Sequence, residues 1–444
     1  MGIRRGTARL AAVLIGGALA ASCTWTASGL AAVSRDTKSS AAVGAAGGGS
    51  DARWQAEAEP GIMAGPLAAR KTSYLSGVYC TARSNCWAFG LDAVGSGPIL
   101  TQALRWNGTG WHQATVPDPG GTSAGDSSEV SAVRCAAASE CWAVGFDQKN
   151  SGPVLAELLR WNGSTWRAMA VPQPAGTRKT SQNQLTDVTC IAARNCWAVG
   201  SFGKSGSGTQ NLVLHWNGTK WTRVRVPEAG GASKQADSEL NSIRCPTTSR
   251  CLAVGSYTTG AAPGEPFNQV LTWNGRSWTA QRVRNPGTGT PDYENTLVSI
   301  GCAAKTSCWA VGPRQATKVQ GILNQVLRWN GRSWVRQRIT QPGGTGSAAK
   351  NELAAVTCTS TRNCWAVGSD GAFSRNQAQH WNGKHWALVA TPDPSLPGVV
   401  PVDALFSVRC TDRANCWAVG AEESPVFVSN EILHWNGTKW SVWT

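Results

Sequence analysis

Fourteen of the fifteen cysteines stand in pairs with the spacing Cys-x5-Cys. Thiols this close together either form disulfides or bind a metal. A zinc site needs four ligands at once, and each pair lacks a partnered histidine, so the sequence predicts disulfides and neither a metal nor another cofactor. Disulfides persist in oxidising, exported environments, which predicts an exported protein. The predicted pairs are Cys80–Cys86, Cys135–Cys141, Cys190–Cys196, Cys245–Cys251, Cys302–Cys308, Cys358–Cys364 and Cys410–Cys416.

The position just before the first cysteine of a pair could bind an anion. It holds Tyr79, Arg134, Arg244 and Arg409 in four of the pairs. Guanidinium groups bind carboxylates and phosphates with two parallel hydrogen bonds. If the fold brings these positions together, they would hold an acidic group. The alternative is that each arginine is a solvated charge at the end of a strand.

A second set of arginines stands in pairs two residues apart, shortly after a recurring tryptophan. Alternate residues of a strand face the same side of a sheet, so each pair could stack on tryptophan and form a surface for polyanions. The alternative is that the charges protect an outer strand from aggregation. The net charge of +15 favours anionic partners without naming one. The residues are Arg223, Arg225, Arg282, Arg284, Arg336 and Arg338.

Catalytic patterns are sparse in the sequence. No metalloprotease, nucleophile-elbow or phosphate-loop motif occurs. Three of the five histidines, His215, His380 and His434, take the repeat position that Arg105 and Arg160 take elsewhere, which indicates a surface strand. The prediction from the residues is therefore a protein that is not an enzyme.

The paired cysteines belong to a repeat that must position all of these groups. Seven segments begin near residues 74, 129, 184, 239, 296, 352 and 404, and each contains Cys-Trp-Ala-Val-Gly or a close variant and ends in Trp-Asn-Gly-x-x-Trp. One segment shows short β-branched runs at 185–190, 196–200, 211–216 and 221–226, and Asn217-Gly218 is a hairpin turn signal. Four strands repeated seven times predict an all-β, seven-bladed β-propeller over residues 53–444, with four antiparallel strands and one disulfide per blade. Most of the 23 tryptophans recur at fixed positions, which favours a role in packing.

The repeat resembles the Asp-box units of sialidase-like propellers, and it is similar to the propeller of photosystem II assembly and stability factors. The resemblance covers residues 72–444 and is carried by Gly-x-x-Trp after a tight turn and by the strand that ends in Trp-Ala-Val-Gly. It implies blade geometry, while function varies freely among such proteins. This chain departs from the Asp-box because a tryptophan replaces the aspartate, and the cysteine pair is an addition. The tryptophans at that position are Trp106, Trp161, Trp216, Trp273, Trp329, Trp381 and Trp435.

Two kinds of loop vary among the repeats, those joining strands two and three and those joining successive blades. Variable loops on a repeating scaffold favour recognition, so the sequence predicts a non-catalytic module that binds a protein or polysaccharide of the cell envelope through these loops. We expect no specific recognition of nucleic acid. We expect the protein to be a monomer. The alternative is an extracellular glycan-active hydrolase of sialidase-like architecture. Residues 53–60 match the fourth-strand pattern and are predicted to add a strand beside the last blade.

The amino terminus has the pattern of an export signal. Arg4, Arg5 and Arg9 precede an apolar run that is too short to span a bilayer. Residues 1–22 are therefore predicted to be a signal peptide. Cys23, the one cysteine without a partner, would then be a lipid attachment site, although a plain secretory signal remains the alternative. The Ala/Gly/Ser-rich residues 23–52 are predicted to be a flexible tether.

Overall fold

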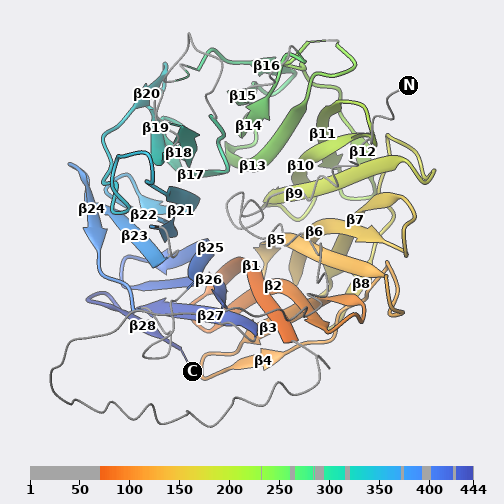
Figure 1. The fold of residues 1–444 in the computed structure, drawn as a ribbon, viewed down its shortest axis with the longest axis horizontal. Coiled ribbons are helices and arrows are strands. Elements are labelled where there is room, and N and C mark those ends of the chain that lie inside the picture. The colour runs from red at the N-terminus through yellow and green to blue at the C-terminus, as the bar shows by residue number, and fades with distance from the viewer. Residues whose placement is uncertain are drawn as a thin grey trace, which may run out of the picture.

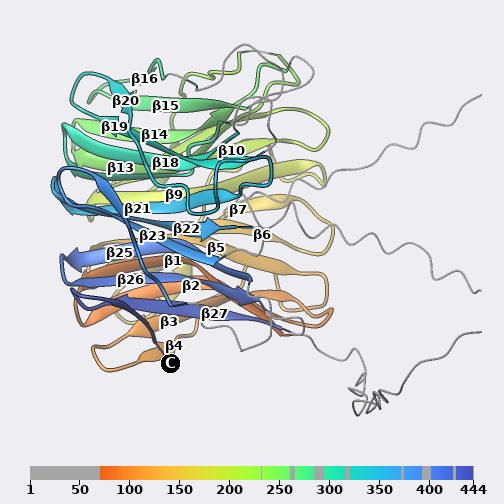
Figure 2. The ribbon, with the colours of Figure 1, turned by 60° about the vertical axis from the view of Figure 1, so that its left-hand side comes forward.

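The structure is a computed structural model, and it describes residues 71–231, 233–260, 266–283, 285, 295–315, 321–371, 375–392, 402–423 and 427–443. The secondary structure of these residues is entirely β, with strands β1 to β28. Consecutive sets of four antiparallel strands form sheets that are arranged in a ring (Figure 1), and the strands run between its two faces (Figure 2). We call these sets units 1 to 7, from β1–β4 to β25–β28. The propeller fold predicted from the repeat is confirmed.

The first strand of each unit lines the inside of the ring, and the second lies beside it (Figure 1). The first strands are β1 (Lys71–Ala82), β5 (Ser127–Ala137), β9 (Ser181–Ala192), β13 (Ser238–Thr247), β17 (Ser299–Ala304), β21 (Asn351–Ser360) and β25 (Val402–Asp412). The second strands are β2 (Asn85–Val94), β6 (Glu140–Gln148), β10 (Asn195–Lys204), β14 (Arg250–Tyr257), β18 (Ser307–Gln315), β22 (Asn363–Asp370) and β26 (Asn415–Glu423).

The third strand ends at the tryptophan of Trp-Asn-Gly, and a short fourth strand forms the outer edge. The third strands are β3 (Ile99–Trp106), β7 (Val154–Trp161), β11 (Thr209–Trp216), β15 (Phe267–Trp273), β19 (Ile322–Trp329), β23 (Arg375–Trp381) and β27 (Val428–Trp435). The fourth strands are β4 (Trp111–Gln113), β8 (Trp166–Ala168), β12 (Trp221–Arg223), β16 (Trp278–Ala280), β20 (Trp334–Arg336), β24 (Trp386–Val389) and β28 (Trp440–Val442).

The seven predicted disulfides all form, because the closed end of the first hairpin brings the two cysteines of each pair together. In unit 1, Cys80 is in register with Cys86, and their Cα atoms are 4.0 Å apart. An oxidising location follows from these bonds. No helix in the described part of the chain is long and apolar enough to cross a membrane. The predicted signal peptide, the tether, Cys23 and the predicted closing strand at 53–60 lie outside the described residues.

The glycine of Cys-Trp-Ala-Val-Gly is required by a bulge in the neighbouring first strand. In unit 2, the register of β5 shifts between Val130 and Ala132, opposite Gly145. A Cβ atom on Gly145 would lie 1.9 Å from the backbone oxygen of Glu129. Units 1, 4 and 6 show the same register shift at the equivalent glycine. The repeat glycine therefore permits the first and second strands to pair through the bulge.

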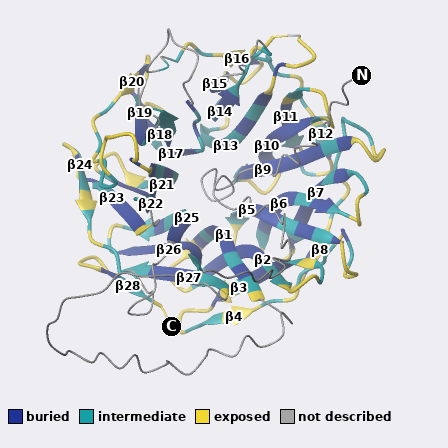
Figure 3. Ribbon diagram, in the orientation of Figure 1, coloured by how far each residue is buried: buried dark blue, intermediate teal, exposed yellow. Residues whose placement is uncertain are grey.

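Tryptophans join neighbouring units, as the sequence predicts. Trp142 of unit 2 packs against Trp216 and Trp221 of unit 3, with ring centroids 4.9 and 5.1 Å away. The same three-ring contact closes the ring, because Trp417 of unit 7 meets Trp106 and Trp111 of unit 1 at 4.8 and 5.3 Å. These rings are buried or nearly so, and buried residues follow the strands throughout the ring (Figure 3). They stabilise the fold rather than bind sugar.

Amide side chains form a second set of contacts between units. Asn268 of β15 and Gln325 of β19 donate to each other at 2.7 and 3.0 Å. Asn211 and Gln269 make the same exchange one unit earlier, with both distances at 3.0 Å. All four side chains are buried. The pairs satisfy polar groups that would otherwise destabilise the core, and they set the register between neighbouring third strands.

Units 7 and 1 meet at the seam of the ring. Arg83 donates from Nε and Nη2 to the two carboxylate oxygens of Asp412 at 2.8 and 2.7 Å. Thr72 of β1 pairs in parallel with Val428 of β27. Similar single parallel pairs join units 1 to 2 and 2 to 3, which merges these sheets into one hydrogen-bonded path. All four strands of units 1 and 7 come from their own stretches of chain.

Candidate functional site

Four residues predicted as anion ligands converge inside the ring. Tyr79, Arg134, Arg244 and Arg409 lie in the first strands β1, β5, β13 and β25, next to the disulfide end of each strand. Each is opposite the second-strand residue that follows the second cysteine, such as Trp87 opposite Tyr79. The fold therefore brings together groups that are up to 330 positions apart in the chain. We call these residues, together with Asp187, the arginine cluster.

Asp187 of β9 is the carboxylate of the cluster. Its Oδ2 accepts hydrogen bonds from Arg244 Nη1 at 2.7 Å and from Ser242 Oγ at 2.7 Å. Arg134 Nη2 lies 3.7 Å from its Oδ1. Burial alone would raise the pKa of Asp187, but the charges of Arg244 and Arg134 outweigh burial and hold this pKa below its ordinary value. Asp187 is therefore ionised and fully engaged by its neighbours.

Tyr79 lies between two guanidinium groups. The guanidinium carbons of Arg409 and Arg134 are 4.4 and 5.3 Å from the centroid of its ring. Arg409 Nη2 also donates to the Tyr79 hydroxyl oxygen at 3.4 Å. Cation–π contacts of this kind orient the ring. The phenol oxygen is thus held beside the positive charges.

The arginine cluster contains more positive than negative charge. Three guanidiniums face one carboxylate, and the side chains of Arg134 and Arg244 are 15% and 19% exposed. Burial and the charges of Arg244 and Arg409 lower the pKa of Arg134 to about 9, despite the opposing charge of Asp187. Arg409 Nε is buried and has no hydrogen-bond partner among the residues that the structure describes. An uncompensated buried charge is costly, so the cluster favours an incoming anion, and its forked donors fit a carboxylate.

The second set of predicted arginines does not form a tryptophan-stacked surface. The fourth strands end two residues after their tryptophan in units 3 to 5, so only Arg223 and Arg336 lie within one. Arg225, Arg282 and Arg338 follow these strands and are exposed, and Arg284 lies outside the described residues. The placement in fourth strands is confirmed for Arg223 and Arg336 and wrong for Arg225, Arg282 and Arg338, because the outer strand is shorter than its β-branched pattern suggests.

The predicted partner of these arginines was also wrong. The Arg223 guanidinium lies 4.2 Å from the Phe202 ring centroid rather than over a tryptophan. Third-strand arginines take that role instead. Arg160, for example, lies 5.5 and 5.6 Å from the ring centroids of Trp142 and Trp216.

Sequence reasoning missed Asp187, although a signal was present. The residue three positions before the first cysteine is small in every other unit, for example Ala132 and Ser242. A charged residue at a position that the repeat keeps small indicates a local requirement. Only the structure shows that the requirement is pairing with Arg244 across neighbouring first strands.

Two half-buried acids lie at the opposite end of the first strands. Glu129 accepts a hydrogen bond from the Tyr74 hydroxyl at 3.0 Å, and Glu239 accepts one from Ser256 Oγ at 3.0 Å. Burial raises the pKa of both carboxyls above the ordinary value. Each acid is thus engaged within its own surroundings and lies apart from the arginine cluster.

Comparisons with known proteins find similar structures but no similar families. No known family matches the sequence, and no curated protein sequence matches it. An ulvan lyase of polysaccharide lyase family 25 superposes with a TM-score of 0.53 at 10% identity, over 85% of this chain and 97% of that one. The polysaccharide lyase Uly1 gives 0.50 at 9% identity, over 82% and 90%.

A family 74 xyloglucanase from Xanthomonas campestris gives a TM-score of 0.49 at 13% identity, over 85% of this chain and 55% of that one. This chain thus spans about half the length of the xyloglucanase. At these identities the likenesses show the fold.

The comparisons overturn the prediction of a non-catalytic binding scaffold. Several of the similar structures are enzymes that act on polysaccharides, among them the two lyases. The predictions that the protein is a scaffold and not an enzyme are therefore withdrawn, and the alternative, a glycan-active enzyme, is taken up below as a proposal. The sequence has no recognisable catalytic motif, and the groups on separate first strands come together only in the folded ring.

Proposed function

We propose that the protein is an exported enzyme that cleaves an acidic polysaccharide at a uronate residue, and that the arginine cluster binds the uronate carboxylate. One observation carries this proposal: Arg134 and Arg409 lie against the Tyr79 ring, Arg244 pairs with Asp187 nearby, and the three guanidiniums outnumber the single carboxylate of Asp187. Guanidiniums fixed around an acidic sugar would neutralise its carboxylate, and a phenol beside them can move a proton. The cluster thus combines an anion site with an acid–base group.

We propose β-elimination as the reaction. The cluster would draw charge from the uronate carboxylate, which makes the proton on C5 more acidic. Tyr79, as the phenolate, would take that proton, and the electrons of the C5–H bond would form the C4=C5 double bond. The bond between C4 and the glycosidic oxygen would break, and Tyr79 would return the proton to that oxygen. The products are an unsaturated uronate and a new sugar end, and no co-reactant is consumed.

Elimination fits the cluster better than hydrolysis does. A glycoside hydrolase places two carboxyl groups on either side of the bond that it cleaves. Asp187 is the one carboxylate of the cluster, and Ser242 and Arg244 already bind it. The superposed ulvan lyase, which was determined bound to -[GlcA(1-4)Rha3S]-, supports a lyase acting on a sugar that carries acidic groups.

The remaining features of the proposal concern architecture and location. Seven units, each with a disulfide, would make a seven-bladed propeller of the kind that the Asp-box resemblance implies. Export would be directed by residues 1–22, and either a lipid on Cys23 or plain secretion would place the ring outside the cell. A polysaccharide of the cell surroundings would then be the partner of the folded chain.

A panel of polysaccharides tests the function. The oxidised chain is incubated with uronate-containing polymers and with neutral polymers of similar length, and the polymer size is followed by gel filtration. The proposal expects at least one uronate polymer to be shortened while the neutral ones stay intact. Shortening of neutral polymers alone would contradict it, as would an Arg244→Ala variant that cleaves as fast as the wild type.

A further inference from the structure

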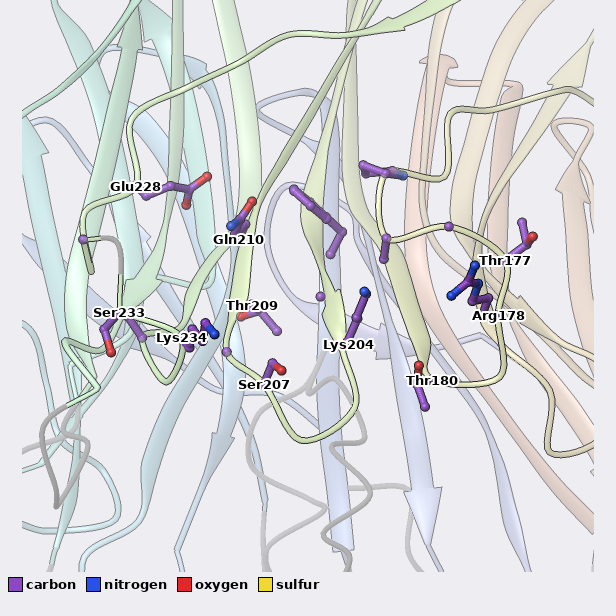
Figure 4. Close-up of a pocket in the computed structure, with 18 residues that line it drawn as sticks. Thr177, Arg178, Thr180, Lys204, Ser207, Thr209, Gln210, Glu228, Ser233 and Lys234 are labelled. Atoms are coloured by element: carbon purple, nitrogen blue, oxygen red, sulfur yellow. The ribbon is translucent and has the colours of Figure 1, made fainter.

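We propose that a cleft between the loops of units 3 and 4 is a second binding site for acidic oligosaccharide, separate from the arginine cluster. The cleft has a volume of about 770 Å³, within the range of about 300–1,000 Å³ that is typical of ligand sites. It is formed by the loop between β10 and β11 and by the loops that precede β9 and β13 (Figure 4). These are the variable loops of the repeat.

Positive side chains dominate the cleft. Arg178, Lys204 and Lys234 line it, and all three are exposed. None of them forms an ion pair within the described part of the chain. Glu228 is the one acid among the lining residues, and burial raises its pKa. The cleft therefore presents unpaired cations that would attract an anionic ligand.

The walls of the cleft are held in place before any ligand arrives. Ser205 N donates to the Thr180 backbone oxygen at 2.8 Å on one side of the loop between β10 and β11. Gly208 N donates to the Lys234 backbone oxygen at 2.7 Å on the other side. The loop is thus bonded to both of its neighbours. A site that is already formed loses less entropy on binding.

The cations are not needed by the repeat itself. The turn that contains Arg178 recurs, with the same backbone hydrogen bond, at Ser123, Ser233 and Gly346. Lys204 lies four residues after the repeat glycine of unit 3, and the equivalent residue in unit 1 is Val94. Because unit 1 folds with an apolar residue at the Lys204 position and other units fold with small residues at the Arg178 position, folding does not require these charges.

A sugar polymer fits the remaining chemistry. The cleft presents hydroxyls, including those of Thr177, Thr180 and Ser207. Hydroxyls suit the hydroxyl groups of a sugar ring, while the three cations suit carboxylate or sulfate groups on it. This inference rests on the proposed function for its ligand class, an acidic polysaccharide, but not on the reaction.

The cleft and the arginine cluster are at opposite ends of the strands. In unit 3 the cluster position is Thr189, which is opposite Trp197 at the start of β10, whereas Lys204 ends this strand. Seven residues of strand correspond to roughly 23 Å. The cleft would therefore hold the polymer away from the bond that is cleaved.

Calorimetric titration tests the inference with three hexasaccharides. Hexagalacturonate carries carboxylates, sulfated maltohexaose carries sulfates, and maltohexaose is neutral. The titrations use the wild type and the Arg244→Ala variant, in which the arginine cluster is disabled. The charge variant is K204A/K234A, and the matched control is K220A/K439A, which removes two exposed lysines from Trp-Asn-Gly turns. Thermal unfolding confirms that each variant is folded.

We expect at least one charged hexasaccharide to bind both in the wild type and in the Arg244→Ala background, and maltohexaose not to bind. K204A/K234A should lower the affinity at least tenfold, and the control less than twofold. Which charged probe binds identifies the group as carboxylate or sulfate. Equal losses in both double variants, or no binding once Arg244 is removed, would overturn the inference. Absence of cleavage by the wild type, with binding to the cleft retained, would contradict the proposed reaction instead.

Discussion

The Arg409 guanidinium lies 4.4 Å from the centroid of the Tyr79 ring, and Arg134 lies 5.3 Å from it. Arg409 belongs to unit 7 and Tyr79 to unit 1, so the contact exists only when the ring is closed. Closure is secured nearby by Arg83 and Asp412. The proposed site is therefore a product of ring closure, and conditions that open the seam should abolish it.

Replacement of Arg409 separates function from stability. Arg409→Met keeps a similar side-chain length and removes a buried charge that has no carboxylate partner of its own. Exchange of a buried charge for an apolar side chain of similar volume is often neutral or stabilising, so Tm should stay level or rise. The rate of polysaccharide cleavage should fall about 100-fold or more, as when a group that stabilises the transition state is removed. Arg332→Met, on an exposed turn, is the control and should change neither.

Removal of the Tyr79 hydroxyl tests the acid–base role. Tyr79→Phe retains the ring between the guanidiniums, so the affinity for a uronate oligosaccharide should change less than threefold. The cleavage rate should fall by about 10² to 10⁴, the typical contribution of a positioned acid or base. Binding is measured by calorimetry and cleavage by gel filtration. A Phe variant that cleaves at the wild-type rate would remove Tyr79 from the mechanism.

Glu157 gives a prediction for stability against pH. It lies opposite Gly145, and Gln269 and Gln325, which form amide pairs, take the same repeat position in units 4 and 5. Neither carboxyl oxygen of Glu157 has a hydrogen-bond partner among the described residues. Burial and the charges of Asp147 and Asp118 raise its pKa well above the ordinary value. Burial also raises the pKa of Asp147, to about 6.

A raised carboxyl pKa favours folding at low pH. The folded chain then keeps a proton that the unfolded chain releases. This contribution to stability is fully present below the carboxyl pKa of the unfolded chain, about 4. It is lost as the pH rises through the higher pKa values of the same carboxyls in the folded chain. Glu157→Gln should therefore raise Tm at about pH 8 and change it little at about pH 4. Thermal unfolding at both pH values checks this, with Glu140→Gln as the control. An equal change at both would show that the proton is not responsible.

The bulge opposite the repeat glycine gives a prediction about the fold. In Gly255→Ala, the new Cβ atom would lie 1.9 Å from the backbone oxygen of Glu239. The strands would have to separate, at a cost of about 3 kcal/mol or more in the free energy of unfolding. Gly346→Ala is the matched control, because a Cβ there meets nothing within 4 Å. Denaturant unfolding that gave equal losses for both variants would contradict this account of the repeat.

Much of the fold could be predicted because the repeat makes each signal appear several times. The cysteine pairs, the Asn-Gly turns and the flanking tryptophans each correspond to a strand end or hairpin, and the structure confirms them. The short fourth strand could not be predicted, since the residues after Arg223 keep a β-branched pattern while only Val224 continues the backbone bonding to β11.

The site was only partly predictable for a different reason. Position in the repeat suggested that Arg134, Arg244 and Arg409 could converge, and they do. The contacts of Arg134 and Arg409 with Tyr79, and of Arg244 with Asp187, depend on how first strands from separate units face one another around the ring. No local pattern encodes that geometry. Asp187 could not be predicted from the repeat, because the repeat pattern indicates residues that recur in several units and an aspartate stands at this position in unit 3 alone.

The most direct test of the central claim is the ultraviolet absorbance of a uronate polysaccharide mixed with the oxidised protein. β-Elimination creates a C4=C5 double bond conjugated to the carboxylate, which absorbs where the intact polymer does not. The proposed function predicts a steady rise in absorbance with the wild type and almost none with Arg409→Met or Tyr79→Phe. New reducing ends without any rise in absorbance would show hydrolysis, and would contradict the elimination proposed for the arginine cluster.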